Sequence, residues 1–143
     1  MLNSLLYTAW VKGVNEVAWS VLIVDDEPMT RTLLQLMLAP TDCEVIEAED
    51  GLDALGKIEQ KIPDLVILDV MMPRMDGITL CRHLRQEAHT ALLPIIMLSA
   101  KTSSEAIQEG LLAGADEYLT KPVSREVLLR SVKALVSRII ATS

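Results

Sequence analysis

The sequence predicts an α/β fold with a doubly wound parallel sheet. From residue 20 onward, short apolar runs alternate with longer segments of helical periodicity, which is the pattern of repeated βα units. The runs at 21–24, 65–68 and 95–98 contain only apolar residues, as expected of strands that are covered on both faces. The length of 143 residues and the hydrophobic content of 50% suffice for one core. We therefore expect one sheet with strands at 21–24, 44–47, 65–68, 95–98 and 117–119.

A helix is predicted after each strand. Apolar residues recur at helical spacing across 28–39. Glu27 could cap this helix or lie near the acidic residues that precede it, and we favour the cap. Asp50 and Asp76 are the expected N-caps of the second and third helices, and Gly114 is a suitable left-handed residue at the end of the fourth. The apolar periodicity of the last two helices comes from Ile107, Leu111, Leu112, Leu128, Val132, Leu135, Val136 and Ile139.

Composition excludes several classes of function. A net charge of −7 and a pI near 4.8 argue against a general surface for nucleic acid or anionic membranes. The chain has neither a run of 18 apolar residues nor a secretory signal, so we expect no membrane span and no export. Cys43 and Cys81 lack metal-ligand spacing and are expected to be reduced thiols in a cytoplasmic protein. His83 and His89 also lack such spacing, and we assign them no role.

Polar residues follow the predicted strands. Right-handed crossovers make the strand order reverse within the sheet, and sites form at the carboxyl ends of strands near that point. The residues in these positions are Asp25, Asp26, Asp69, Ser99 and Lys121. Three carboxylates held close together repel one another, and a hard divalent cation such as Mg²⁺ relieves the repulsion. An ammonium and a hydroxyl can in turn bind a phosphoryl oxygen.

Each of these residues also has a simpler interpretation. The Asp25-Asp26 pair could cap a helix, and Ser99 could satisfy loop backbone. Lys121 could be a solvated lysine, and Tyr118 a half-buried strand residue with its hydroxyl in water. Their occurrence together and in order favours the functional interpretation.

Four segments resemble the receiver domains of two-component response regulators: Val24–Glu27, Leu68–Gly77, Leu98–Ala100 and Tyr118–Pro122. The resemblance covers roughly residues 20–140 and is much more specific than any one motif. It implies a (βα)5 flavodoxin-like fold with a five-stranded parallel sheet in the order 2-1-3-4-5. It also implies a receiver domain at 20–143, preceded by an extension at 1–19.

The resemblance assigns roles to individual residues. It makes Asp69 the phosphoacceptor, which attacks the phosphorus of a phosphohistidine. Asp26, Asp69 and the backbone carbonyl of Met71 would bind Mg²⁺ directly, with Asp25 acting through metal-bound water. Lys121 would pair with Asp69 at rest and with a phosphoryl oxygen after transfer.

The resemblance also implies a conformational switch. Ser99 and Tyr118 would form the switch pair, in which the hydroxyl moves to the phosphoryl oxygen and the ring turns inward. The Lys121-Pro122 peptide bond would be cis. Met71 and Lys101 flank the site and would tune hydrolysis of the phosphoryl group.

The implied partners are a sensor histidine kinase or phosphotransfer protein and a downstream effector protein or domain. No direct binding to nucleic acid or membrane is expected. A homodimer could form through the last strand and its flanking helices, with these charges facing one another: Arg125, Arg130, Lys133 and Arg138 on one side, and Glu105, Glu109, Asp116 and Glu117 on the other. The same charges could equally be solvated.

Two other functions compete with a phosphorylation switch, which would not be a turnover enzyme. One is a phosphorylation-independent binding module on a receiver fold. The other is a phosphohydrolase with an aspartate nucleophile, but such enzymes resemble one another in a D-x-D motif after the first strand, whereas Asp25 and Asp26 are adjacent.

Residues 1–19 lie outside the resemblance and are unusually apolar. Twelve of these 19 residues are hydrophobic, and only Lys12 and Glu16 are charged. Leu6, Trp10, Val14 and Val17 could line one helical face, which predicts an amphipathic helix that packs on the domain or on a partner chain. A disordered extension or a misassigned start codon remains the alternative.

Overall fold

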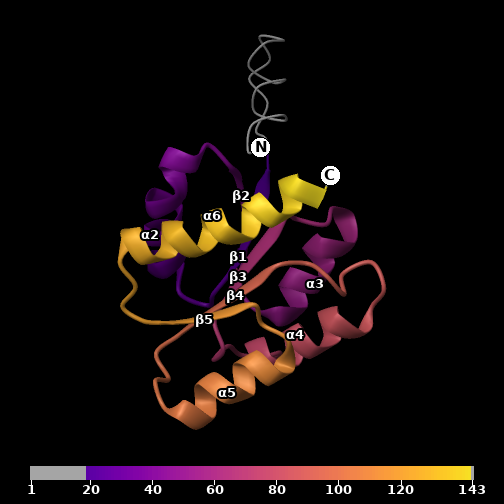
Figure 1. Ribbon diagram of the computed structural model, residues 1–143. Coiled ribbons are helices and arrows are strands. Elements are labelled where there is room, and N and C mark those ends of the chain that lie inside the picture. The colour runs from indigo at the N-terminus through magenta and orange to yellow at the C-terminus, as the bar shows by residue number, and fades with distance from the viewer. Residues whose placement is uncertain (1–18, 143) are drawn as a thin grey trace.

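The computed structural model describes the backbone of residues 19–142 and the side chains of residues 19–137. Strands and helices alternate along this part of the chain (Figure 1). The strands are β1 (Ser20–Val24), β2 (Glu44–Ala48), β3 (Leu65–Leu68), β4 (Ile95–Ser99) and β5 (Glu117–Thr120). The helices are α2 (Pro28–Leu38), the 3-10 helix η1 (Ala39–Thr41), α3 (Gly51–Gln60), α4 (Gly77–Gln86), α5 (Ser104–Ala113) and α6 (Arg125–Thr142). The helix predicted within 1–19 lies outside the described residues.

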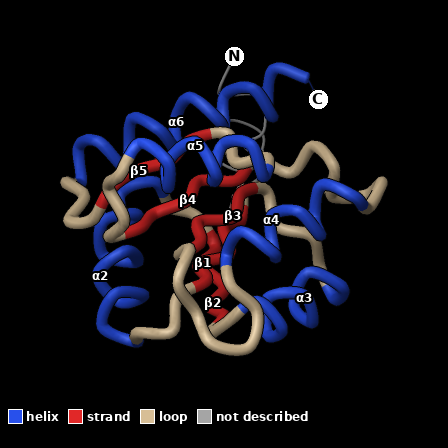
Figure 2. Tube along the Cα trace, turned by 90° about the horizontal axis from the view of Figure 1, so that it is seen from below, coloured by secondary structure: helices blue, strands red, loops and turns tan. Residues whose placement is uncertain are grey.

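The strands form one parallel sheet in the order β2-β1-β3-β4-β5, as Figure 2 shows. The chain passes from β1 to the edge strand β2 and then returns to β3 on the other side of β1. The direction of winding therefore reverses between β1 and β3. The predicted α/β class, the parallel sheet and the strand order are confirmed.

Both faces of the sheet are buried, which explains the uninterrupted apolar runs. Helices α2 and α6 cover one face, and α3, α4 and α5 cover the other (Figure 1). Alternate residues of β1 belong to different cores: Leu22 and Val24 pack beneath α3 and α4, whereas Val21 and Ile23 pack beneath α2 and α6. A polar residue on either side of β1 would therefore be removed from water.

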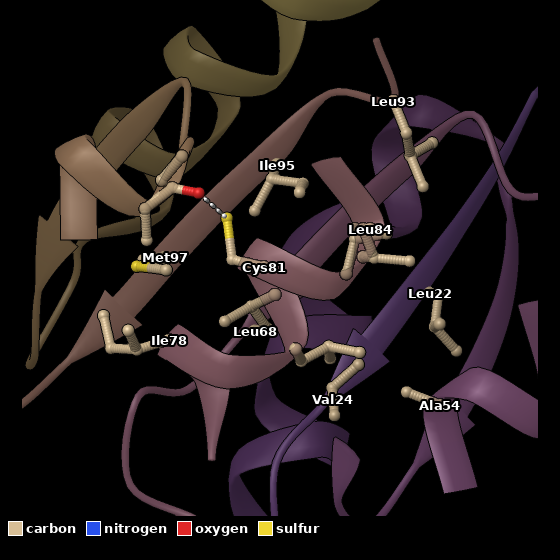
Figure 3. Packing of buried hydrophobic residues seen from close by; sticks show 14 of the residues in the cluster. Leu22, Val24, Ala54, Leu68, Ile78, Cys81, Leu84, Leu93, Ile95 and Met97 are labelled. Atoms are coloured by element: carbon tan, nitrogen blue, oxygen red, sulfur yellow. Dashed lines mark hydrogen bonds between the residues drawn. The ribbon is translucent and has the colours of Figure 1, made fainter. Parts of the chain in front are cut away.

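Both cysteines are free thiols. Cys81 is buried among Ile95, Leu84 and Met97, and its Sγ donates a hydrogen bond to the carbonyl of Ala113 at 3.5 Å (Figure 3). Burial raises the pKa of the Cys81 thiol to about 11 and also raises the pKa of half-buried Cys43. Because the thiolate is the reactive form, these environments favour a structural role for both residues.

Three predicted helix boundaries are confirmed. The Asp50 side chain caps α3 by accepting from the N–H of Asp53 at 2.9 Å. The Asp76 side chain caps α4 in the same way, and α5 ends at Gly114 with φ of 119°. The sequence signals at these positions are therefore local and reliable.

The prediction for Glu27 is wrong. Glu27 occupies the N-cap position of α2, but its side chain makes no capping hydrogen bond. Instead, its own backbone N–H donates to Oδ1 of Asp25 at 2.9 Å. An aspartate side chain readily accepts a hydrogen bond from the backbone N–H two residues later, so the turn before α2 is stabilised by Asp25 and not by Glu27.

Helical spacing did not identify which leucines are buried. In α5, Gly110 and Ala113 face the core, whereas Leu112 is 78% exposed. A Cβ on Gly110 would lie only 2.7 Å from the ring of Tyr118, so this helix approaches β5 through its small residues. In α2, Leu34 and Leu38 are buried, but Leu33 is 52% exposed.

Two glycines provide a matched test of how closely the helices pack. A Cβ on Gly77 would lie 2.2 Å from the backbone oxygen of Asp69, whereas a Cβ on Gly56 meets nothing within 4 Å. Gly77→Ala should lower the free energy of unfolding by about 2–3 kcal/mol because α4 must move away from β3. Gly56→Ala should raise it by about 0.5–1 kcal/mol. Urea denaturation measures both, and equal stability of the two variants would contradict the close contact.

Candidate acidic phosphoryl-acceptor site

Three aspartates converge at the carboxyl ends of two neighbouring strands. Asp25 directly follows β1 and Asp69 directly follows β3, and the N–H of Asp69 donates to the carbonyl of Val24 at 3.0 Å. Carboxylate oxygens of Asp25, Asp26 and Asp69 all lie within 4.8 Å of one another. Asp25 and Asp69 are buried, whereas Asp26 is exposed. The expected acidic cluster is therefore present.

Lys121 reaches this cluster from the end of β5. Its Nζ lies 2.9 Å from Oδ2 of Asp25 and 3.3 Å from Oδ2 of Asp69. The resemblance implied a pairing with Asp69, but the shorter contact is with Asp25. The Lys121-Pro122 peptide bond is cis, as expected.

The charges of buried Asp69 and partly buried Lys121 perturb each other. Burial raises the pKa of Asp69, and the favourable charge of Lys121 offsets this effect only partly, because the nearby carboxylate of Asp25 raises the pKa further. Burial lowers the pKa of Lys121, but the hydrogen bond to Asp25 and the charge of Asp69 outweigh it, so the net shift is upward. One ammonium thus faces three carboxylates, and the fold disfavours the ionised form of Asp69.

The donor set fits a small hard cation. Carboxylate oxygens are ligands that Mg²⁺ prefers, and Mg²⁺ also keeps several water molecules. Met71 lies beside the cluster, because its N–H donates to Oδ1 of Asp69 at 3.3 Å. An open pocket of about 410 Å³ adjoins the cluster and is lined in part by Asp26, Met71 and Lys101. A further ligand therefore has room to approach Asp69 from solvent.

Ser99 and Tyr118 are joined through one loop residue. Ser99 is fully buried at the end of β4, and its Oγ accepts from the N–H of Lys101 at 3.1 Å. The Tyr118 hydroxyl donates to the carbonyl of the same Lys101 at 2.8 Å. The sequence did not predict this link, because it uses only the backbone of Lys101 and leaves no side-chain signal.

Comparison with known proteins identifies the family. The model of the response regulator receiver domain matches residues 21–133. The chain belongs to the response regulator receiver domain family. It is a receiver domain of the kind found in two-component response regulators, and such domains work with histidine kinases and output domains.

Individual relatives differ in length. The chain is 46% identical over 118 residues to the alkaline phosphatase synthesis transcriptional regulatory protein PhoP of Bacillus subtilis, covering 82% of this chain and 48% of PhoP. It is 40% identical over 116 residues to protein PilG of Pseudomonas aeruginosa, covering 81% of this chain and 86% of PilG. The chain thus spans about half the length of PhoP.

A solved structure agrees with the fold. Chemotaxis protein CheY4 of Vibrio cholerae superposes with a TM-score of 0.76 at 36% identity, covering 82% of this chain and 98% of CheY4. Between residues 19 and 142, no helix combines the length and the apolar character needed to span a bilayer.

The unfavourable burial of the ionised Asp69 carboxylate beside Asp25 leads to a stability prediction. Asp69→Asn should raise the melting temperature at neutral pH without Mg²⁺ by roughly 2–5 °C, because a neutral amide removes the disfavoured charge. Since the folded-state pKa of Asp69 is raised, the difference in melting temperature between the variant and the unmodified chain should be absent below about pH 4. It should appear as the pH rises through that pKa. Added Mg²⁺ should reduce this difference in melting temperature, because the cation relieves the repulsion between the carboxylates.

The control for this prediction is Asp76→Asn, which removes one exposed charge and keeps a good N-cap residue on α4. Its melting temperature should match that of the unmodified chain. Differential scanning calorimetry across pH tests both variants, and the idea fails if Asp69→Asn melts no higher than Asp76→Asn at neutral pH.

Proposed function

We propose that this receiver domain accepts a phosphoryl group on Asp69 in the presence of Mg²⁺ and changes conformation to control a partner protein or output domain. The observation that carries the proposal is the buried carboxylate of Asp69, which lies 3.3 Å from Lys121 and within 4.8 Å of two further aspartates. In this setting the protein aligns the reactants and neutralises charge, which is what phosphoryl transfer requires.

The chemistry follows from these positions. A carboxylate oxygen of Asp69 forms a bond to the phosphorus of a donor phosphohistidine as the phosphorus–nitrogen bond breaks. The electron pair of the broken bond goes to the imidazole, which takes up a proton. Lys121, whose Nζ lies 3.3 Å from Oδ2 of Asp69, would pair with an oxygen of the new acyl phosphate. Asp26, Asp69 and the Met71 carbonyl would hold Mg²⁺, with Asp25 acting through water, and the ion supplies positive charge for the phosphoryl oxygens.

Phosphorylation would change the contacts of the switch pair. When the Ser99 hydroxyl bonds to a phosphoryl oxygen, it gives up the N–H of Lys101. The loop before α5 can then move, and Tyr118 loses the carbonyl that holds its hydroxyl outward. A shift of this kind needs only a few kcal/mol of difference between two conformations.

The proposed partners are a sensor histidine kinase or phosphotransfer protein as donor and an effector protein or domain as the target. A homodimer through β5, α5 and α6 is also part of the proposal, although several of the expected charges are paired within the chain. Arg130 lies 3.1 Å from Glu126, and Asp116 lies 3.2 Å from Arg85. Two of the expected charges, Arg130 and Asp116, therefore already have partners within the chain.

Acetyl phosphate tests the acceptor directly. The purified chain should gain the mass of one phosphoryl group with acetyl phosphate and Mg²⁺, because this small donor needs no docking surface. EDTA should abolish the gain by removing the cation, and Asp69→Asn should abolish it by removing the nucleophile. Intact-mass spectrometry reads out the result, with Asp76→Asn as the control that remains modified.

The outcomes separate the three functions. Absence of modification, while another receiver domain is modified under the same conditions, would favour the phosphorylation-independent binding module. Sustained hydrolysis of a small phosphate ester such as p-nitrophenyl phosphate would favour the phosphohydrolase.

The proposed docking surface for the donor protein is an apolar stripe on α2. Met29, Leu33 and Leu36 are all more than half exposed and follow one another at helical spacing. This apolar stripe begins three residues after Asp26, so a protein that presents a phosphohistidine to Asp69 would pass over it.

Leu33→Glu tests this surface. Phosphoryl transfer to this variant from a phosphotransfer protein should be about tenfold slower than transfer to the chain without the substitution, because a charge replaces an apolar contact. The substitution should leave modification by acetyl phosphate unchanged. Leu112→Glu on α5 is the control, since Leu112 is also an exposed leucine, at 78% against 52% for Leu33, but its helix covers the other face of the sheet. Equal transfer rates for both variants would remove α2 from the proposal.

A further inference from the structure

Arg74 has an unusual backbone conformation. Between residues 19 and 142, only Asp42 and Arg74 are non-glycine residues with positive φ, and φ of Arg74 is 66°. Long side chains rarely adopt this left-handed region, whereas glycine adopts it freely. Something in the surrounding structure must therefore hold Arg74 in place.

The side chain of Arg74 provides that contact. Its guanidinium lies 2.5 Å from Oδ2 of Asp50 and 3.8 Å from Oε1 of Glu49. Asp50 is buried, and its other oxygen caps α3 through the N–H of Asp53. Burial raises the pKa of Asp50, but the hydrogen bonds from Asp53 and Arg74 outweigh this, so the pKa is lowered. One carboxylate thus holds the start of α3 and the loop that carries Arg74.

Two backbone hydrogen bonds also hold the loop between β3 and α4 (residues 69–76). The N–H of Gly51 donates to the carbonyl of Met75 at 3.2 Å, and the N–H of Gly77 donates to the carbonyl of Val70 at 2.9 Å. The Arg74–Asp50 ion pair therefore closes a loop whose backbone is already folded toward α3. Met71, the expected carbonyl ligand of Mg²⁺, belongs to this same loop.

We propose that Arg74 is a positioning residue, whose ion pair with Asp50 fixes the β3–α4 loop so that the Met71 carbonyl is held ready for Mg²⁺. This inference rests on the proposed function, because it presumes a cation at Asp26 and Asp69. Arg74 would not touch the cation or the phosphoryl group itself.

Electrostatics alone makes the opposite prediction for one variant. Arg74 is a positive charge near a cation site, so its removal should strengthen Mg²⁺ binding if only long-range charge matters. If positioning matters, removal should weaken binding. The direction of change in an arginine variant therefore separates the two effects.

The experiment uses the full chain and Mg²⁺ alone, with isothermal titration calorimetry as the readout. Arg74→Gly removes the side chain while accepting φ of 66° without strain. Asp50→Asn removes the charge of the partner and keeps a good N-cap residue on α3. The double variant has the net charge of the unmodified chain, which makes it the deciding comparison. Arg130→Ala, an exposed arginine on α6, is the control.

We expect Arg74→Gly to bind Mg²⁺ about fivefold more weakly, because groups that orient metal ligands commonly contribute tenfold or more and Arg74 acts one step further out. The double variant should bind no more weakly than Arg74→Gly, because both substitutions break the same ion pair. Unchanged or tighter binding by Arg74→Gly and the double variant would overturn the proposal. So would a lowered melting temperature of Arg74→Gly with an unchanged dissociation constant, which is the result of a purely structural role.

Amide hydrogen exchange in the metal-free protein distinguishes failure of this inference from failure of the proposed function. The amides of Gly51 and Gly77 should exchange faster in Arg74→Gly than in Arg130→Ala. If the unmodified chain bound no Mg²⁺, the proposed function would fail, and this inference with it. If it binds Mg²⁺ but the exchange of both amides is unchanged, the proposed function stands and the positioning role of Arg74 is overturned.

Discussion

The site depends on the placement of two buried carboxylates at the end of adjacent parallel strands. Asp25 and Asp69 follow β1 and β3, which pair directly in the sheet, so their charges cannot move apart. An unpaired buried charge is costly, and the only cation in hydrogen-bonding distance of both, among the described residues, is Lys121. Lys121 comes from β5, two strands away from β3. The charges of Asp25 and Asp69 are therefore partly offset by Lys121 only when β1, β3, β4 and β5 have assembled.

This geometry also explains the position of the switch residues. Lys121 must pass β4 to reach the carboxylates, and its N–H donates to the carbonyl of Ser99 at the end of that strand. Ser99 is thus buried directly beside the lysine that would bind a phosphoryl oxygen. Tyr118, three residues before Lys121, shares the Lys101 backbone with Ser99. A change in charge at Asp69 would therefore affect Ser99 through the adjacent Lys121, and would affect Tyr118 through the backbone of Lys101.

Much of the fold was predictable because its signals are local. Strands buried on both faces must be apolar throughout, and Asp50, Asp76 and Gly114 mark helix ends by their own chemistry. The burial of particular leucines was not predictable, because Leu33 and Leu112 have the same helical spacing as buried residues. Their exposure is decided by neighbours distant in sequence, such as Tyr118, which packs against Gly110. The Lys121–Asp25 contact was missed for the same reason: strand order fixes which loops meet, but not which carboxylate a long side chain reaches first.

The left-handed backbone conformation of Arg74 could not be predicted from the sequence either. A glycine in the β3–α4 loop would have indicated a left-handed residue, whereas an arginine carries no such signal. The strained backbone at Arg74 is tolerated because the guanidinium reaches a buried carboxylate, and that carboxylate is already fixed as the cap of α3. The conformation of a loop beside the acidic cluster is therefore set by a helix N-terminus outside the cluster. Substitutions at the start of α3 should therefore act on the site through this ion pair.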